Sequence, residues 1–119
     1  MADTTSSSDS QSGLPEVVAR YHDAHDRRDT DVALSAFTAG ATVRDEGREY
    51  HGTDQIRTWL GTAGAGFTFT RTFVSAEATD ADVWVVVNRL EGDFPGGAVD
   101  LRYRYVLTDG LISELVIAP

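Results

Sequence analysis

Apolar residues near the start of the chain recur every three or four positions, which places them on one face of an α-helix. This stripe consists of Leu14, Val17, Val18, Tyr21 and His25. Pro15 suits the first turn of a helix. The pattern therefore predicts a helix over about 15–28.

Two shorter helices are predicted further along the chain. Asp29, Thr30 and Asp31 offer capping oxygens for a helix that continues through Phe37. A third helix begins at 52–54 and carries its apolar residues at Ile56, Trp59 and Leu60. The glycine-rich stretch 61–66 closes it. Two short strands, 41–45 and 48–51, are expected between these helices.

The second half of the chain has the patterns of β-strands. Phe67, Phe69 and Phe73 alternate with threonines, and 83–90 is a nearly continuous apolar run. Apolar and polar residues alternate over 99–107, which is typical of a strand with one buried face. Asp109-Gly110 makes a turn into a last strand, 111–117.

This order of elements predicts an α+β fold, with the helices gathered on one face of an antiparallel sheet. Residues 14–119 are expected to form one domain, since 119 residues are too few for two ordinary ones. Residues 1–13 are almost all Ser, Thr, Asp and other small or polar types, so a disordered tail is predicted there.

Composition and charge exclude several classes of function. The chain has 10 basic and 19 acidic residues, a formal net charge of −9, which disfavours binding to nucleic acid or to anionic membranes. Every basic residue is Arg, which excludes lysine Schiff-base chemistry, pyridoxal phosphate anchoring and a Walker lysine. The absence of Cys excludes thiolate nucleophiles and cysteine metal sites. With no apolar run of membrane length and no secretory signal, a cytoplasmic protein is expected.

Four short segments carry a resemblance to a known family. They are 17–21 in the first helix, the strand 41–45, the start of the third helix at 52–57, and the turn 109–112. In this order they resemble the NTF2-like superfamily, and within it the ketosteroid isomerase and SnoaL-like polyketide cyclase families. The spacing from Tyr21 to Asp45 is similar to that between the catalytic Tyr and Asp of the isomerase.

The resemblance implies a cone-shaped, curved antiparallel sheet wrapped around three N-terminal helices, with a pocket in the cone. It also implies a homodimer formed through the outer face of the sheet. Asp45 would be the base that moves a proton next to a carbonyl, and Tyr21 would donate a hydrogen bond to the enolate oxygen. Without the resemblance, Asp45 could equally be a turn residue facing water, and Tyr21 a core residue.

The sequence departs from the isomerase pattern at the third catalytic position. The family has a protonated Asp on the next-to-last strand, and aligning back from the turn at 109–110 puts Tyr103 at or near it. The second oxyanion donor is therefore Tyr103 or absent. Further residues are expected to line the pocket. These are His25, Trp59, Phe69, Leu101 and Tyr105.

Arg71 and the histidines of the first helix allow more than one interpretation. Arg71 shares a strand face with Phe69 and, if buried, would need an acidic partner such as Asp45 or a ligand carboxylate. A bulge that turns Arg71 outward is favoured instead, because curved strands commonly carry bulges. His22 and His25 could share a metal ion, but no third ligand accompanies them, so no metal site is predicted. His51 could also line the pocket.

These observations favour a cofactor-independent proton-transfer enzyme, of isomerase or cyclase type, acting on a small apolar, steroid- or polyketide-like carbonyl compound. The alternative is a non-catalytic NTF2-like module that binds a ligand or holds subunits together. The absence of the family's acidic donor supports this alternative, whereas Asp45 and Tyr21 at the family spacing support the enzyme.

Overall fold

The computed structural model describes residues 13–62 and 68–119, which form three helices and six strands. The helices are α2 (Glu16–Asp26), α3 (Thr30–Ser35) and α4 (Gly52–Thr62). The strands are β1 (Phe37–Asp45), β2 (Arg48–His51), β3 (Phe69–Asp80), β4 (Val83–Gly92), β5 (Ala98–Thr108) and β6 (Leu111–Ala118). The predicted order of elements, helices first and a strand meander afterwards, is confirmed.

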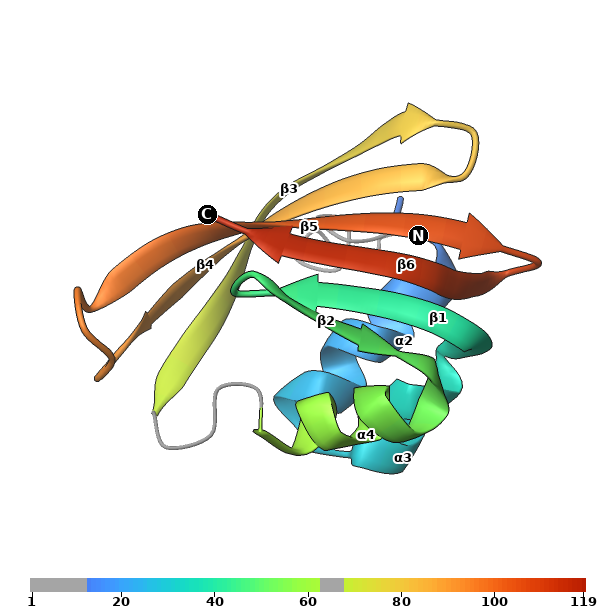
Figure 1. Ribbon diagram of the computed structural model, residues 1–119. Helices are drawn as coiled ribbons and strands as arrows, with labels where there is room; N and C mark the ends of the chain where they lie inside the picture. Colours follow the sequence, from blue (N-terminus) through green and yellow to red (C-terminus); the bar gives the residue numbers. More distant parts are fainter. Residues whose placement is uncertain (1–12, 63–67) are drawn as a thin grey trace.

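The six strands form one sheet in the order β2-β1-β6-β5-β4-β3. Neighbouring strands are antiparallel except for β1 and β6, which run parallel and join the two halves of the chain. Register shifts in β1, β3 and β5 help to bend the sheet. Figure 1 shows the curved, unclosed sheet with all three helices on one side of it. The α+β, NTF2-like architecture is confirmed.

The core lies between the concave side of the sheet and the helices. Helix α2 buries Val17, Val18 and Tyr21, as its apolar stripe predicts, and also His22 and Ala24. Helix α4 packs against β1 and β2 and buries Ile56, Trp59 and Leu60, the three positions predicted. The sheet contributes fully buried Val86, Tyr105 and Leu115, among others, to the same cluster.

The predicted second helix is too long. Helix α3 ends at Ser35, and Phe37 is already the first residue of β1, where it pairs with Ile112 of β6. The backbone N–H of Ile112 donates to the carbonyl of Ala36 at 2.8 Å, so sheet pairing takes over where the helix pattern would continue. Of the predicted tail, residues 1–12 lie outside the described residues, as do 63–67 of the predicted helix-closing stretch and strand start. No helix within 13–62 and 68–119 is long and apolar enough to cross a membrane.

Candidate functional site

An inner cavity of about 120 Å³ lies between α2, α4 and the concave side of the sheet. Helix α2 supplies Tyr21, His25 and Asp26 to its wall, and α4 supplies Trp59. The end of β1 supplies Asp45, next to Glu46 of the β1–β2 turn. Residues on the remaining wall come from β3 to β6 and include Phe69, Arg71, Leu90, Leu101, Tyr103 and Ile117. Seven of the eight predicted site residues therefore surround one space.

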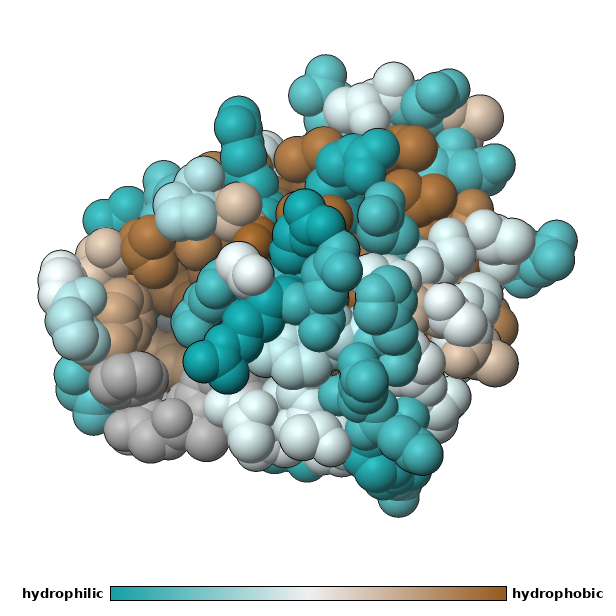
Figure 2. All heavy atoms as spheres, in the orientation of Figure 1, coloured by the Kyte–Doolittle hydropathy of each residue, from teal (hydrophilic) through white to brown (hydrophobic). Residues whose placement is uncertain are grey.

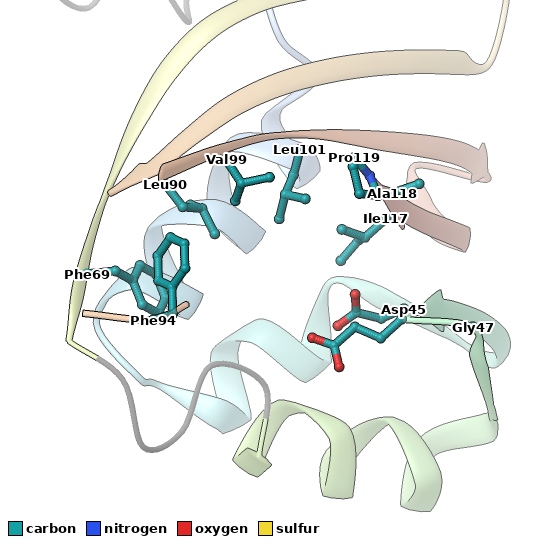
Figure 3. Close-up of a pocket in the computed structure, with 11 residues that line it drawn as sticks. Asp45, Gly47, Phe69, Leu90, Phe94, Val99, Leu101, Ile117, Ala118 and Pro119 are labelled. Atoms are coloured by element: carbon teal, nitrogen blue, oxygen red, sulfur yellow. The ribbon is translucent and has the colours of Figure 1, made fainter. Parts of the chain in front are cut away.

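A larger outer chamber of about 400 Å³ adjoins the inner cavity, and Asp45 lines both. Most of its remaining wall is apolar and comes from β4, β5 and β6. Figure 3 shows Leu90, Val99 and Leu101 on one side of the chamber and the Asp45 carboxylate across from them. In Figure 2, hydrophobic residues gather around a hollow at the left of the molecule, near the β4–β5 hairpin. The chamber suits an apolar body attached to a polar group that reaches inward.

Asp45 is a half-buried carboxylate with one strong hydrogen bond. The indole N–H of Trp59 donates to Asp45 Oδ2 at 3.0 Å. Burial raises the pKa of Asp45, and the negative charge of Glu46 raises it further, whereas the Trp59 hydrogen bond lowers it. The net effect is a pKa above the ordinary value. Asp45 is therefore a stronger base than an exposed carboxylate, and it stands beside both cavities.

Tyr21 and Tyr103 are buried phenols that stay protonated. Burial raises the pKa of Tyr103 to about 12 and that of Tyr21 well above its ordinary value. The charge of Asp45 raises both pKa values further, because all three groups face the inner cavity. A protonated phenol in such a place can donate a hydrogen bond to a ligand oxygen.

The prediction that a bulge turns Arg71 outward is wrong. Both bulges in β3 fall after Phe73, so Arg71 stays on the inward face, and the first bulge leaves Val74 exposed. The guanidinium binds the carboxylate of Asp26 through Nε and Nη2, at 2.9 and 2.6 Å. It also donates from Nη1 to Asn88 Oδ1 at 2.9 Å. The acidic partner that a buried Arg requires is thus Asp26 and not Asp45.

The remaining predicted residues divide between the cavity and its surroundings. His25, Trp59, Phe69 and Leu101 line the inner cavity. Tyr105 lines neither chamber, because it is fully buried behind the wall, where its hydroxyl and Nε2 of His22 form a 2.7 Å hydrogen bond. His51 is exposed and contacts Thr42 through Nδ1. Over the described part of the chain, no three His, Asp or Glu side chains gather to hold a metal ion.

Sequence reasoning missed Asp26 and Asn88. Asn88 is fully buried and interrupts the apolar run of β4, so it could have been noticed as a lone polar side chain on an inward face. Asp26 gave no such signal, because the end of α2 is rich in charged residues. Only the fold brings it to Arg71, 45 positions later.

The comparisons with known proteins agree with this architecture. The model of the SnoaL-like domain matches residues 18–115. A candidate polyketide cyclase from Sinorhizobium meliloti is 32% identical in sequence, with a TM-score of 0.82 over 88% of this chain and 95% of that one. No curated protein matches the chain.

Two more distant structures share the fold and hold small molecules. A protein from Catenulispora acidiphila with a ketosteroid isomerase-like fold, in complex with trimethylamine, is 20% identical, with a TM-score of 0.76 over 88% of this chain and 85% of that one. A Mycobacterium tuberculosis protein in complex with estradiol-17β-hemisuccinate is 15% identical, with a TM-score of 0.71 over 87% and 90%. These likenesses concern the fold.

Proposed function

Because the chain belongs to the SnoaL-like domain family, we propose that it is an enzyme that moves a proton on a small apolar carbonyl compound. The observation that carries the proposal is the meeting of one base and two phenol donors, Asp45, Tyr21 and Tyr103, around a single cavity. That cavity adjoins an apolar chamber large enough for the body of a ligand.

Each of the three residues has one task in the proposed reaction. The Asp45 carboxylate accepts the acidic proton from the carbon next to the carbonyl. The electron pair left behind moves onto the carbonyl oxygen, and Tyr21 and Tyr103 donate hydrogen bonds to the resulting enolate. Asp45 then returns the proton to another carbon, which isomerises the compound without any change in oxidation state. A cyclase would use the same enolate to attack a second carbonyl of the substrate.

The substrate class follows from the two chambers. The inner cavity, at about 120 Å³, has room for little more than the reacting group. The body of the ligand would lie in the outer chamber against Leu90, Val99 and Leu101. This arrangement favours a steroid- or polyketide-like ketone. The bound steroid ester of the Mycobacterium tuberculosis structure is consistent with such a ligand.

A homodimer through the convex face of the sheet is part of the proposal. Val85 on β4 and Val116 on β6 both pair with Arg104 of β5, so the three side chains share the face opposite the cavity. Both valines are only half-buried. A second copy covering them would remove apolar surface from water. We expect Val85→Glu to convert a dimer to a monomer in light scattering, and a monomeric unsubstituted protein would contradict this assembly.

The enzyme is tested by ultraviolet absorbance with a panel of β,γ-unsaturated ketones, steroidal and smaller. Conjugation should appear with the unsubstituted protein and not with Asp45→Asn. Asp100→Asn is the matched control, because Asp100 is an exposed carboxylate on β5 that accepts a hydrogen bond from Arg89 of β4. If the panel is bound but not converted, the chain is a ligand-binding module. If Asp45→Asn converts it at the original rate, Asp45 is not the base.

A further inference from the structure

Asn88 stands in a chain of polar contacts that runs from the surface residue Asp26 into the core. The Asp26 carboxylate holds the Arg71 guanidinium by two parallel hydrogen bonds, and Arg71 Nη1 donates to Asn88 Oδ1 at 2.9 Å. Bidentate pairing of this kind fixes the plane of a guanidinium. The side chain of Arg71 is only 13% exposed, and Asn88 is completely buried. The Arg71–Asn88 contact is therefore largely shielded from water, whereas Asp26, whose side chain is 42% exposed, anchors the guanidinium at the protein surface.

Arg71 determines which way round the amide of Asn88 lies. A guanidinium can only donate hydrogen bonds, so the atom of Asn88 that faces it must be the oxygen. The amide nitrogen must then face the other way. Nδ2 makes no hydrogen bond of full geometry within the described residues, and a buried donor without an acceptor is energetically unfavourable. This nitrogen therefore needs an acceptor close by.

The register of the sheet points to Tyr103 as that acceptor. Asn88 of β4 lies opposite Leu101 of β5, and Val86 lies opposite Tyr103. Asn88 and Tyr103 are thus diagonal neighbours on the inward face, within reach of each other's side chains. The Asn88 side chain also lowers the pKa of Tyr103, as a donor close to the phenol oxygen would.

We propose that Asp26, Arg71 and Asn88 are positioning residues that direct the hydroxyl proton of Tyr103 into the inner cavity. The proposal rests on the function proposed above, in which Tyr103 contacts the ligand oxygen. A phenol has one proton to donate, and its oxygen can accept other hydrogen bonds. When Asn88 Nδ2 donates to that oxygen, the hydroxyl proton remains available for the ligand. No proton is transferred along the chain, which only sets its direction.

This arrangement selects ligands by hydrogen-bond type. An oxygen that accepts, as in a ketone, an enolate or a phenolate, can take the proton that Tyr103 offers. An ammonium group can only donate and would meet another donor. The same chain explains how this protein can hold a second oxyanion donor without the acidic residue found in ketosteroid isomerases. Arg71 supports that donor through Asn88, because its Nη1 donates to Asn88 Oδ1 while its Nε and Nη2 are held by Asp26.

The orientation of the amide is tested without any substrate. Asn88 is the only Asn in the chain, so protein labelled with ¹⁵N-asparagine has one side-chain amide pair in its NMR spectrum. We expect slow hydrogen exchange for that pair and a clear shift of one of its protons in Tyr103→Phe. Tyr50→Phe is the matched control, because Tyr50 packs beside Trp59 and lines neither chamber. A pair that is unchanged in Tyr103→Phe overturns the proposal.

Binding of 2-naphthol, a phenol that mimics the enolate, tests the consequence. Asn88→Asp keeps a partner for Arg71 but replaces the donor with an acceptor, which would draw the Tyr103 proton away from the cavity. We expect at least a tenfold loss of affinity in both Asn88→Asp and Tyr103→Phe. If only Tyr103→Phe weakens binding, the positioning chain is wrong and the donor role of Tyr103 stands. If neither variant weakens it, Tyr103 does not donate, and both proposals fail at that residue. Should Asn88→Asp not fold, the NMR experiment decides alone.

Discussion

The hydrogen bond from Trp59 to Asp45 offers a direct test of how the proposed base is tuned. Trp59→Phe keeps an aromatic ring in the wall and removes the indole N–H that lies 3.0 Å from Asp45 Oδ2. A hydrogen bond to a charged acceptor contributes about 1.5–3 kcal/mol, and one to a neutral acceptor about 0.5–1.5 kcal/mol. The difference, about 1–1.5 kcal/mol, corresponds to about 1 pKa unit. We therefore expect the already raised pKa of Asp45 to rise by about 1 unit.

The sign of the stability change follows from the same pKa. A carboxyl whose pKa is raised by folding stabilises the folded state only at low pH, where it is protonated, and this contribution is lost as the pH rises through the folded pKa. Trp59→Phe should therefore destabilise the protein more at pH 7 than at pH 3, by about 1–1.5 kcal/mol beyond the pH-independent packing loss.

Two measurements decide the matter. Carboxyl ¹³C titration by NMR reports the pKa of Asp45 directly, and denaturant unfolding at several pH values reports the stability difference. Trp84→Phe is the matched control, since Trp84 lies on β4 away from Asp45 and pairs with Tyr105 across the sheet. An Asp45 pKa that does not move in Trp59→Phe, or that moves equally in Trp84→Phe, would refute the assigned role of the indole.

Three further outcomes follow from the packing. Gly92→Ala should destabilise the protein by about 1–3 kcal/mol in thermal unfolding. The reason is that an added Cβ would meet the backbone of Thr68 and lie 2.6 Å from Cβ of Phe69. Unchanged stability would contradict that close approach. Burial lowers the pKa of His22 well below its ordinary 6.5, so the free energy of unfolding should fall as the pH drops below about 6.5. His22→Gln should reduce the slope of that free energy against pH by up to about 1.4 kcal/mol per pH unit. An unaltered slope would be inconsistent with a buried neutral imidazole. Tyr105→Phe should cost about 1–3 kcal/mol in chemical denaturation by leaving Nε2 of His22 without its partner, and a loss below 0.5 kcal/mol would argue against that buried bond.

Local patterns were sufficient for most of the fold. The stripe that includes Val17 and Tyr21 and the alternation in β5 each reflect one buried face, and burial is a local signal when its period matches the element. The end of the second helix could not be predicted this way. Phenylalanine occurs in both helices and strands, so Phe37 itself gives no signal. Its pairing with Ile112 depends on a segment 75 positions away.

The site was predictable in part for the same reason. Asp45 and Tyr21 were identified through a resemblance in spacing, and the fold brings them to one cavity. Arg71 was assigned to the wrong face, because the position of a bulge within a strand leaves no reliable trace in alternation. The partnership of Arg71 with Asp26 and Asn88 joins three elements, and sequence distance carries no information about such contacts.

The parallel pairing of β1 with β6 has an evolutionary consequence. At this pairing the sheet joins two segments of sequence, and each segment contributes different residues to the cavity. The segment up to Thr62 carries the proposed base, Asp45, together with the indole that donates a hydrogen bond to it. The segment from Thr68 onward carries most of the wall that a ligand would touch. Substitutions in the later segment would therefore alter the ligand-facing wall and the proposed donor Tyr103, whereas the proposed base and its indole partner would be inherited unchanged.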